Sequence, residues 1–326
     1  MTASFVILSD GRAGHYNLST GLLSGFDPTA TPRMLDLPAP RKPLKRLVLL
    51  GSTLFRHCPR ILKTLYQAYY GTPPPAILTE KLIVSTGGDT LVANIILAAV
   101  HGIPNIFLGR RSWFTHAGVR LLVTTAGKPV TDRVLVLPLA PVSAPAMPGP
   151  PRSGPIRLMA VLIGGDSNEY RYTAADYSTL AASLNKLCAR TGIRLLLSTS
   201  RRTGLANETV LRETLDPSVI EEATWYNSAP RPVSQDYYRR ADCILCGEDS
   251  GTMLTEAIAW RKPVLAFRPQ DCRTTNFYNN FLRRVADCHV CFHSLEELAN
   301  AEPDRMPAAV PPDMTATHAA MTQLLL

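Results

Sequence analysis

Short runs of aliphatic and β-branched residues recur along this chain, and each is followed by an amphipathic stretch. Three of these runs are SFVILS at 4–9, KLIVST at 81–86 and CILCG at 243–247. Strands without polar alternation are buried on both faces, which is typical of parallel sheets covered by helices on each side. The pattern therefore predicts an α/β fold built from βα units.

The predicted elements fill both halves of the sequence. In the first half we expect strands at 4–9, 33–37, 45–51, 81–86, 105–109, 119–125 and 132–139, with helices near 15–24, 57–70 and 89–101. In the second half we expect strands at 156–164, 193–200, 224–227, 243–247 and 263–267, with helices near 173–191, 206–215, 234–240, 250–260 and 275–286.

A proline-rich segment separates the two halves. The segment PVSAPAMPGPPRSGP holds six prolines and two glycines, which interrupt helices and central strands alike. We therefore predict an N-terminal domain at 1–140, a semi-rigid linker at 141–155 and a C-terminal domain at 156–326. Each domain would be Rossmann-like, and the two would face each other across a cleft. Ligands of such sheets bind beyond the carboxyl ends of the strands.

Composition excludes several classes of protein. Hydrophobic residues make up 46% of the chain and charged residues 18%, a globular balance. No apolar run reaches the ~18 residues of a membrane span, and no basic segment precedes the first strand, so we expect a cytoplasmic protein. Seven cysteines are an odd number for a disulfide framework. Cys243 and Cys246 have zinc-like spacing, but residues i and i+3 of a strand point to opposite faces, so we expect buried thiols and no metal.

The positive charge lies in the first half. Residues 1–150 hold 15 lysines and arginines against six acidic residues, whereas residues 151–326 carry a net charge of −1. We expect no nucleic-acid partner, because no basic run is interleaved with aromatic residues. An anionic membrane surface is an expected partner, which would place the protein peripherally on the inner face of the cytoplasmic membrane. Its basic residues would be Arg41, Lys42, Lys45, Arg46, Arg56, Arg60 and Lys63, and its apolar complement Leu62, Leu65, Tyr66, Tyr69 and Tyr70. An ordinary core stripe explains the apolar set equally well.

The loop SDGRAGHYN (9–17), after the first strand, carries the candidate catalytic groups. Asp10 and His15 can exchange a proton near neutral pH, and the next helix offers its N-terminus. We predict that His15 is a general base oriented by Asp10, or that Asp10 is itself the base. The alternative is a structural turn. The acceptor-side loop would include Gly11, Arg12, Gly14 and Asn17.

Three loops of the second half suit a nucleotide diphosphate. LIGGDSNEYRY (162–172) offers N–H and hydroxyl donors, and LLLSTSRRTG (195–204) offers two adjacent arginines that can bind phosphate as forks. In CGEDSGT (246–252) a serine, a glycine and a threonine begin a helix, where phosphate binds well, although Ser250 could equally cap that helix. Glu256 could accept both hydroxyls of a ribose. The predicted donor residues are Gly164, Gly165, Asp166, Ser167, Ser200, Arg201, Arg202, Thr203, Glu248, Asp249, Ser250, Gly251, Thr252 and Glu256.

These motifs resemble a known family. Ser250-Gly251-Thr252 with Glu256 is similar to the donor-nucleotide motif of GT-B glycosyltransferases of the MurG and lipid-A-disaccharide synthase kind. DGRAGHYN, LIGGDSNEYRYT, STSRRTG and EDSGTMLTEA together resemble the mitochondrial-fission Elm-type family, whose bacterial members are described as GtrOC-type glycosyltransferases. The segment 81–112, with GGDT and GRRS, departs from that pattern. The resemblance implies a GT-B-like fold, a nucleotide-sugar co-substrate, most simply a UDP-sugar, and no further cofactor.

The expected function is transfer of a sugar from a nucleotide-sugar to a hydroxyl of a glycolipid or saccharide acceptor of the cell envelope, such as lipopolysaccharide. The chain contains no D-x-D motif, so arginines, hydroxyls and a helix N-terminus would stabilise the leaving group without a metal. A single base predicts inversion. A non-hydrolysing nucleotide-sugar epimerase is one alternative, which needs more carboxylates and histidines. A non-catalytic membrane-remodelling scaffold is the other, and it has no use for the predicted catalytic and donor residues.

Overall fold

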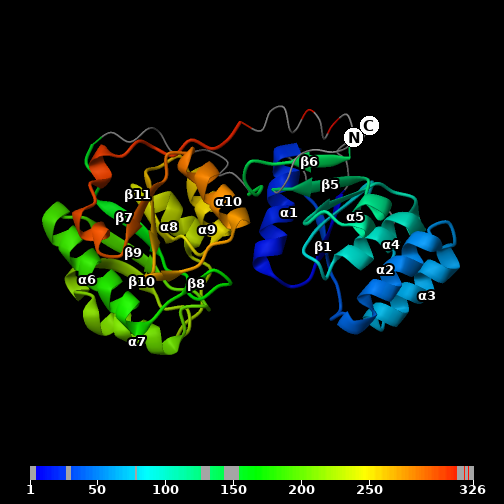
Figure 1. The fold of residues 1–326 in the computed structure, drawn as a ribbon, viewed down its shortest axis with the longest axis horizontal. Helices are drawn as coiled ribbons and strands as arrows, with labels where there is room; N and C mark the ends of the chain where they lie inside the picture. Colours follow the sequence, from blue (N-terminus) through cyan, green and yellow to red (C-terminus); the bar gives the residue numbers. More distant parts are fainter. Residues whose placement is uncertain are drawn as a thin grey trace. The chain divides into compact units, whose positions relative to one another are not determined.

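In a computed structural model of this protein, the described residues are 5–26, 31–77, 79–125, 133–142, 154–313, 319 and 322. The chain divides into two compact units, Met1–Ser143 with Asp313–Leu326, and Ala144–Pro312. Most of the predicted linker, from 143 to 153, lies outside the described residues, as do residues 4 and 132 of two predicted strands. Each unit has its own parallel sheet flanked by helices (Figure 1). The predicted fold class, two Rossmann-like α/β domains, is confirmed.

The first unit is a parallel sheet in the strand order β2-β1-β3-β4-β5-β6. Its elements are β1 (Phe5–Ser9), α1 (Ala13–Phe26), β2 (Arg33–Asp36), α2 (Lys45–Leu54), α3 (Pro59–Tyr70), β3 (Leu82–Thr86), α4 (Leu91–His101), β4 (Asn105–Leu108), α5 (Trp113–Gly118), β5 (Leu121–Thr124) and β6 (Val134–Val136). Alternate residues of β1 face opposite layers. Phe5 and Ile7 pack with Leu22 of α1, whereas Val6 and Leu8 pack with residues of α2, α3 and α4. Figure 1 shows α1 on one side of β1 and these three helices on the other. Both faces are covered, so the strand is continuously apolar.

The second unit repeats this plan in the order β10-β9-β7-β11-β12-β14. Its elements are β7 (Leu158–Leu162), β8 (Tyr170–Arg171), α6 (Ala174–Thr191), β9 (Arg194–Ser198), α7 (Leu205–Thr214), β10 (Ile220–Thr224), α8 (Ser234–Arg240), β11 (Cys243–Gly247), α9 (Gly251–Ala259), β12 (Val264–Arg268), β13 (Asp271–Cys272), α10 (Asn276–Ala286) and β14 (Cys291–Ser294). β8 and β13 form a separate antiparallel pair.

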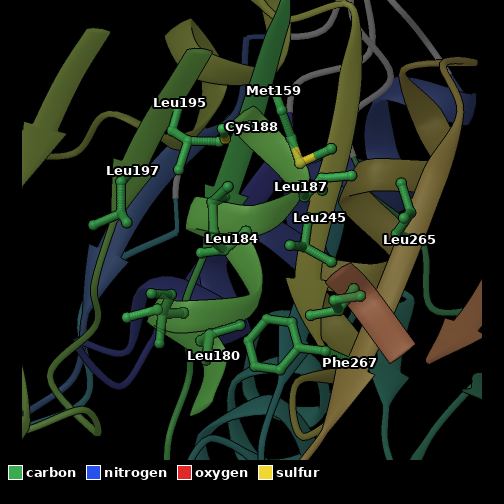
Figure 2. Close-up of a cluster of buried hydrophobic side chains, with 14 of the residues drawn as sticks. Met159, Leu180, Leu184, Leu187, Cys188, Leu195, Leu197, Leu245, Leu265 and Phe267 are labelled. Atoms are coloured by element: carbon green, nitrogen blue, oxygen red, sulfur yellow. The ribbon is translucent and has the colours of Figure 1, made fainter. Parts of the chain in front are cut away.

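Helix α6 covers one face of the second sheet. Figure 2 shows its side chains Leu180 and Leu184 lying against residues of the strands, among them Leu197 and Leu245. Each of these four side chains is fully buried. The packing fixes the positions of β7, β9 and β11, and therefore the loops at their carboxyl ends.

The predicted strand at 45–51 is wrong, because these residues form helix α2. Val48, Leu49 and Ser52 are buried on one face of the helix, as a 3.6-residue period requires. The opposite face is also apolar. Leu47 and Leu54 are each 67% exposed, and the run KRLVLLG therefore has no polar alternation from which a helix could be recognised.

Two further expectations need correction. The apolar stripe of the predicted helix 57–70 does not face outwards: Leu62, Tyr66, Tyr69 and Tyr70 of α3 are buried and Leu65 packs against the same cluster, so the core interpretation is confirmed. The predicted strand at 224–227 is displaced, because β10 ends at Thr224. The next N–H groups leave the ladder, since Tyr226 donates to the hydroxyl of Thr199 and Asn227 to the carboxylate of Glu208.

The positions of the thiols in the strand agree with the sequence. No helix among the described residues is both long enough and apolar enough to cross a bilayer. Cys243 and Cys246 are fully buried in β11, as the strand interpretation predicts. Among the described residues, no group of three or more His, Cys, Asp or Glu side chains is arranged to hold a metal ion.

Candidate functional site

Three neighbouring strands of the second unit bring the predicted donor loops together. β9, β7 and β11 are adjacent and parallel, so their carboxyl ends lie at one edge of the sheet. The loops that follow them contain Arg201 and Arg202, Gly164 to Ser167, and Glu248 to Ser250. Residues from three distant stretches of the sequence thus meet at the edge where α/β sheets bind ligands.

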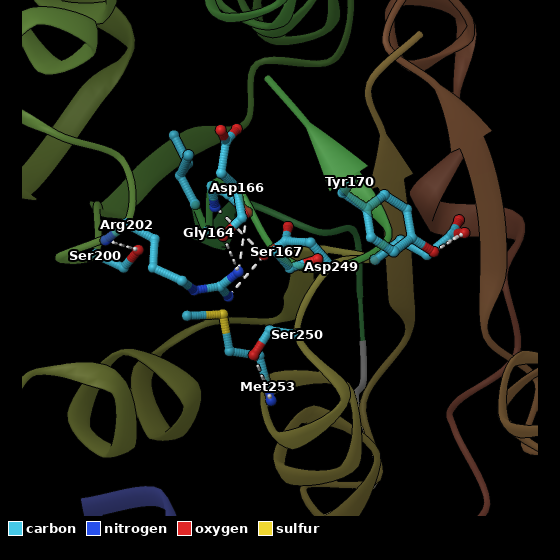
Figure 3. A network of polar contacts seen from close by, with 12 residues as sticks. Gly164, Asp166, Ser167, Tyr170, Ser200, Arg202, Asp249, Ser250 and Met253 are labelled. Carbon is cyan, nitrogen blue, oxygen red and sulfur yellow. Dashed lines mark hydrogen bonds and ion pairs between the residues drawn. The ribbon is translucent and has the colours of Figure 1, made fainter. Parts of the chain in front are cut away.

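The ion pair between Arg202 and Asp249 is the centre of this edge. The Arg202 Nη2 atom lies 2.7 Å from Asp249 Oδ2, and Nη1 donates to the carbonyl oxygens of Gly165 and Asp166 at 2.9 and 3.2 Å. Figure 3 shows the arginine side chain extending across the strand ends to reach them. The Asp249 side chain is fully buried, whereas that of Arg202 is 30% exposed. These two predicted donor residues therefore hold the loops to one another.

Gly164 and Gly165 serve close approach between these loops. A Cβ atom on Gly164 would overlap the Asp249 carboxylate, and one on Gly165 would overlap the carbonyl group of Arg202. The Thr203 hydroxyl donates to the Gly164 carbonyl at 2.7 Å, and it accepts from the Ser200 N–H at 3.0 Å. The glycine pair is thus required by packing, whether or not a phosphate binds beside it.

Tyrosines that the sequence analysis did not single out complete the network. Tyr172 donates to Asp249 Oδ1 at 2.8 Å, and Tyr170 donates to Glu248 Oε1 at 2.6 Å. Glu248 is fully buried. Burial raises the pKa of its carboxyl group, and the Tyr170 hydrogen bond and the Arg268 charge oppose that rise. Both tyrosines lie in the NEYRY motif. Their positions two residues apart were the sequence signal from which a role in this network could have been predicted.

Three other predicted donor residues have polar side-chain groups without a partner in the described part of the chain. The hydroxyl of Ser167 is buried without a hydrogen-bond partner. The side chains of Arg201, which is exposed, and of Thr252 make no hydrogen bond or ion pair with any described residue. These three residues follow β7, β9 and β11, so each of the three strand ends offers one group that a ligand could engage.

Helix α9 carries the last predicted donor residues. Ser250 is its N-cap, and its hydroxyl accepts from the N–H of Met253 at 3.4 Å (Figure 3). Thr252 and Glu256 are four residues apart and share one face of the helix. Glu256 is half-buried. Burial first, and then charges that include that of Glu256, raise the pKa of Tyr238, so Glu256 lies near α8.

The first unit pairs the predicted catalytic residues. His15 Nδ1 lies 2.9 Å from Asp10 Oδ2 and 3.1 Å from Asp10 Oδ1. The Asp10 side chain is 8% exposed and that of His15 28%. An ionised carboxylate accepts hydrogen bonds only, so Nδ1 is the donor, and a neutral imidazole in this tautomer has its lone pair on Nε2. Nε2 has no partner among the described residues. The pair has the arrangement of an oriented base.

The loop after β3 lies directly beside this pair. Gly87 has a φ of +93°, and a Cβ atom there would overlap the His15 ring. Arg12 contacts the Asp89 carboxylate at 3.5 Å and Asp10 at 3.9 Å. β1 and β3 are adjacent parallel strands, so residues 77 positions apart, such as Arg12 and Asp89, reach one edge. The sequence analysis did not assign Gly87 or Asp89, although GGDT follows a predicted strand.

Similarity to solved structures identifies the class of fold. The chain is similar to Staphylococcus aureus MnaA in complex with UDP, with a TM-score of 0.50, 12% identity, and coverage of 91% of this chain and 86% of that one. It is similar to a Listeria monocytogenes protein described as a UDP-N-acetylglucosamine 2-epimerase, with a TM-score of 0.51, 11% identity, and coverage of 92% and 87%. Acinetobacter baumannii MurG aligns at 0.44, with 12% identity over 99% and 91%. The fold is GT-B-like, with two Rossmann-like domains.

A family model narrows this class. The model described as Mitochondrial fission ELM1 matches residues 150–308. The predicted resemblance to that family is confirmed over this stretch, which holds all of the predicted donor loops. No curated protein matches the sequence.

Proposed function

We propose that this protein is a glycosyltransferase that moves a sugar from a nucleotide-sugar to an acceptor hydroxyl. The observation that carries the proposal is the Asp10–His15 pair, in which the carboxylate orients the imidazole and leaves Nε2 with its lone pair. A scaffold has no need of an oriented base at the carboxyl end of a strand. The nucleotide would bind the second unit, where Ser167, Arg201 and Thr252 have polar groups without a partner in the described part of the chain.

The reaction would be a single displacement. The acceptor oxygen would form a bond to the anomeric carbon, and the bond from that carbon to the phosphate oxygen would break. The nucleoside diphosphate would leave with the bonding electrons, and the acceptor proton would pass to His15 Nε2. Arg201 and the N-terminus of α9 would stabilise the charge on the departing diphosphate. The product would have the inverted anomeric configuration.

UDP is the first nucleotide to test, because MnaA, which shares the fold, was solved with UDP. A thermal-shift panel of UDP-, GDP-, CMP- and dTDP-sugars would find the donor. A ligand at 100 times its dissociation constant stabilises the protein by about 2.7 kcal/mol, which is readily measured.

Variants of the predicted donor residues should lose affinity for different parts of the nucleotide. Glu256→Ala removes the ribose contact, so it should weaken both the nucleoside and its diphosphate by ~1.5–3 kcal/mol. Arg201→Ala removes phosphate charge, so it should weaken only the diphosphate. Isothermal titration with each ligand measures both effects.

Arg305→Ala is the matched control. Arg305 is 80% exposed, and its neighbour Asp304 accepts a hydrogen bond from the N–H of Ile156 at the amino end of β7. Arg305 therefore lies at the end of the strand opposite the predicted donor loops. This variant should leave both affinities unchanged. Wild-type affinity in Glu256→Ala would refute the ribose assignment. Equal losses of nucleoside and diphosphate in Arg201→Ala would mean that the arginine is structural.

The fold is shared with an epimerase, so the assay needs an arm without acceptor. Incubation of the protein with UDP-N-acetylglucosamine alone should leave the sugar unchanged. Conversion to its 2-epimer, followed by nuclear magnetic resonance, would replace the transferase proposal with the epimerase.

We also propose that the first unit binds an anionic membrane through helix α2, in place of the buried stripe of α3. Leu47, Leu50 and Leu54 are exposed on the face of α2 opposite its core contacts, and Phe55 follows them. The sequence places Arg46, Arg56, Arg60 and Lys63 on or beside the same helix, and the whole unit is strongly basic. An apolar face bordered by cations fits a bilayer with anionic headgroups.

Flotation with vesicles containing phosphatidylglycerol tests this surface. Wild-type protein should float at low salt and be released at high salt, since screening weakens electrostatic attraction. Each fully inserted leucine contributes about 1.5–3 kcal/mol, so the double variant Leu47→Ser/Leu54→Ser should lower partitioning at least tenfold.

Leu205→Ser is the control, because Leu205 is 61% exposed in the other unit. Its partitioning should equal that of the wild type. Binding only to neutral vesicles, or equal partitioning of the double variant and the control, would refute the α2 surface.

A further inference from the structure

A pocket of about 450 Å³ opens in the first unit, beside the loops that follow β3 and β4. Lys45 and Arg46, at the start of α2, line it together with Arg110 from the loop after β4. No acidic side chain lines it. Neither Lys45 nor Arg46 forms a side-chain ion pair or hydrogen bond with the described residues. The pocket thus gathers positive charge, and two of its three cations, Lys45 and Arg46, are not paired within the described part of the chain.

The rest of the lining is mostly apolar. Leu49 and Leu91 come from α2 and α4, and Phe107 and Phe114 from β4 and α5. Gly88 keeps one wall open, and the Lys45 Nζ atom lies 3.0 Å from where a Cβ atom on that glycine would stand. Cations above apolar walls match a ligand whose anionic group adjoins a hydrocarbon chain. A free sugar or a bare phosphate would leave one of these two features unused.

The pocket adjoins the Asp10–His15 pair. Gly88 lines the pocket, and its neighbour Gly87 lies against the His15 ring. A ligand seated with its anionic group near Lys45 would therefore have its polar end beside the base. The loop that joins the two sites is GGDT, and Gly109, Arg110 and Ser112 of the segment GRRS also line the pocket.

We propose that this pocket, the Lys45 pocket, binds the acceptor, and that the acceptor is an anionic amphiphile such as a lipid phosphate. The proposal rests on the proposed glycosyltransferase function, because the bound amphiphile is an acceptor only if the protein transfers a sugar to it. The binding itself can be measured without any nucleotide or turnover.

The test uses isothermal titration of the whole protein with decyl phosphate, below its micelle concentration. Inorganic phosphate and decyl maltoside are the comparison ligands, since each has only one of the two features. Decyl phosphate should bind at least about tenfold more tightly than either. Lys45→Met removes a charge-assisted contact and should weaken decyl phosphate about tenfold or more. Gly88→Val fills the pocket and should have a similar effect.

Lys81→Met is the matched control, because Lys81 is exposed and precedes β3 at the opposite edge of the sheet. It should bind decyl phosphate as the wild type does. Equal affinity for decyl maltoside, or wild-type affinity in both Lys45→Met and Gly88→Val, would overturn the proposal. A loss in Leu47→Ser/Leu54→Ser without a loss in Lys45→Met would place the amphiphile on the surface of α2 and also overturn it.

The outcome is separable from that of the proposed function. Decyl phosphate binding that needs Lys45, in a protein that binds no nucleotide-sugar, would keep the pocket and refute the transferase. Nucleotide-sugar binding with no affinity for decyl phosphate would refute the pocket alone.

Discussion

His15→Ala is expected to lower kcat by about 10²–10⁴, with donor affinity unchanged within a few-fold. Loss of a general base raises the barrier to transfer and does not touch the bound ground state. The Asp10 carboxylate holds Nδ1 of the imidazole at 2.9 Å, so Nε2 is the atom that would receive the acceptor proton. The measurement is steady-state transfer with the donor identified by the binding panel, alongside titration of that donor.

Variants of neighbouring residues separate the two possible roles. Asp10→Asn keeps the shape of the side chain but can orient the wrong tautomer, and it should also slow transfer. His101→Ala, at the far end of α4, should have no effect. Loss of turnover in Asp10→Asn with normal turnover in His15→Ala would make Asp10 the base. Normal turnover in both variants would show that the loop is a structural turn.

Arg202→Ala is expected to lower the free energy of unfolding by about 3–5 kcal/mol, whereas Arg201→Ala should change it by about 0.5 kcal/mol or less. The two arginines are adjacent in sequence and equal in charge. Only Arg202 pairs with the fully buried Asp249, so its removal leaves a carboxylate in the interior without its cation. Urea denaturation followed by circular dichroism measures both values.

A double-mutant cycle identifies the cause. Arg202→Ala/Asp249→Ala should be less destabilised than the sum of the single variants, because the second change removes the uncompensated charge. Additive losses, or equal stability of Arg201→Ala and Arg202→Ala, would contradict the role of this ion pair in holding the loops together.

Much of the fold could be read from the sequence because the strands are buried on both faces. The strand Cys243–Gly247 and the helix Ser234–Arg240 have the bounds that were predicted. Parallel order then determines which loops meet, since β9, β7 and β11 end at one edge. The proximity of Asp10 and His15 also follows from the sequence, because they flank a single strand-to-helix turn.

Helix α2 shows where such reasoning fails. Its sequence lacks polar alternation because Leu47, Leu50 and Leu54 remain on the surface. A pattern of burial can be recognised only where the solvent side is polar, and here the exposed leucines remove that contrast. The membrane interpretation of the apolar stripe of α3 failed for a different reason. Amphipathic spacing predicts an apolar face but does not say whether the protein core or a membrane covers it.

The α/β class, most strand positions and the loops that carry polar groups could thus be predicted from the amino-acid sequence, because these depend on local periodicity and turn chemistry. The three-dimensional structure was needed to show that Arg202 pairs with the buried Asp249, whereas Arg201 is exposed and has no partner in the described part of the chain. It also brought Lys45 and Gly88 to one pocket and Asp89 to Arg12. Such assignments depend on which side chains from distant stretches of the sequence are buried together. Local sequence patterns do not contain that information.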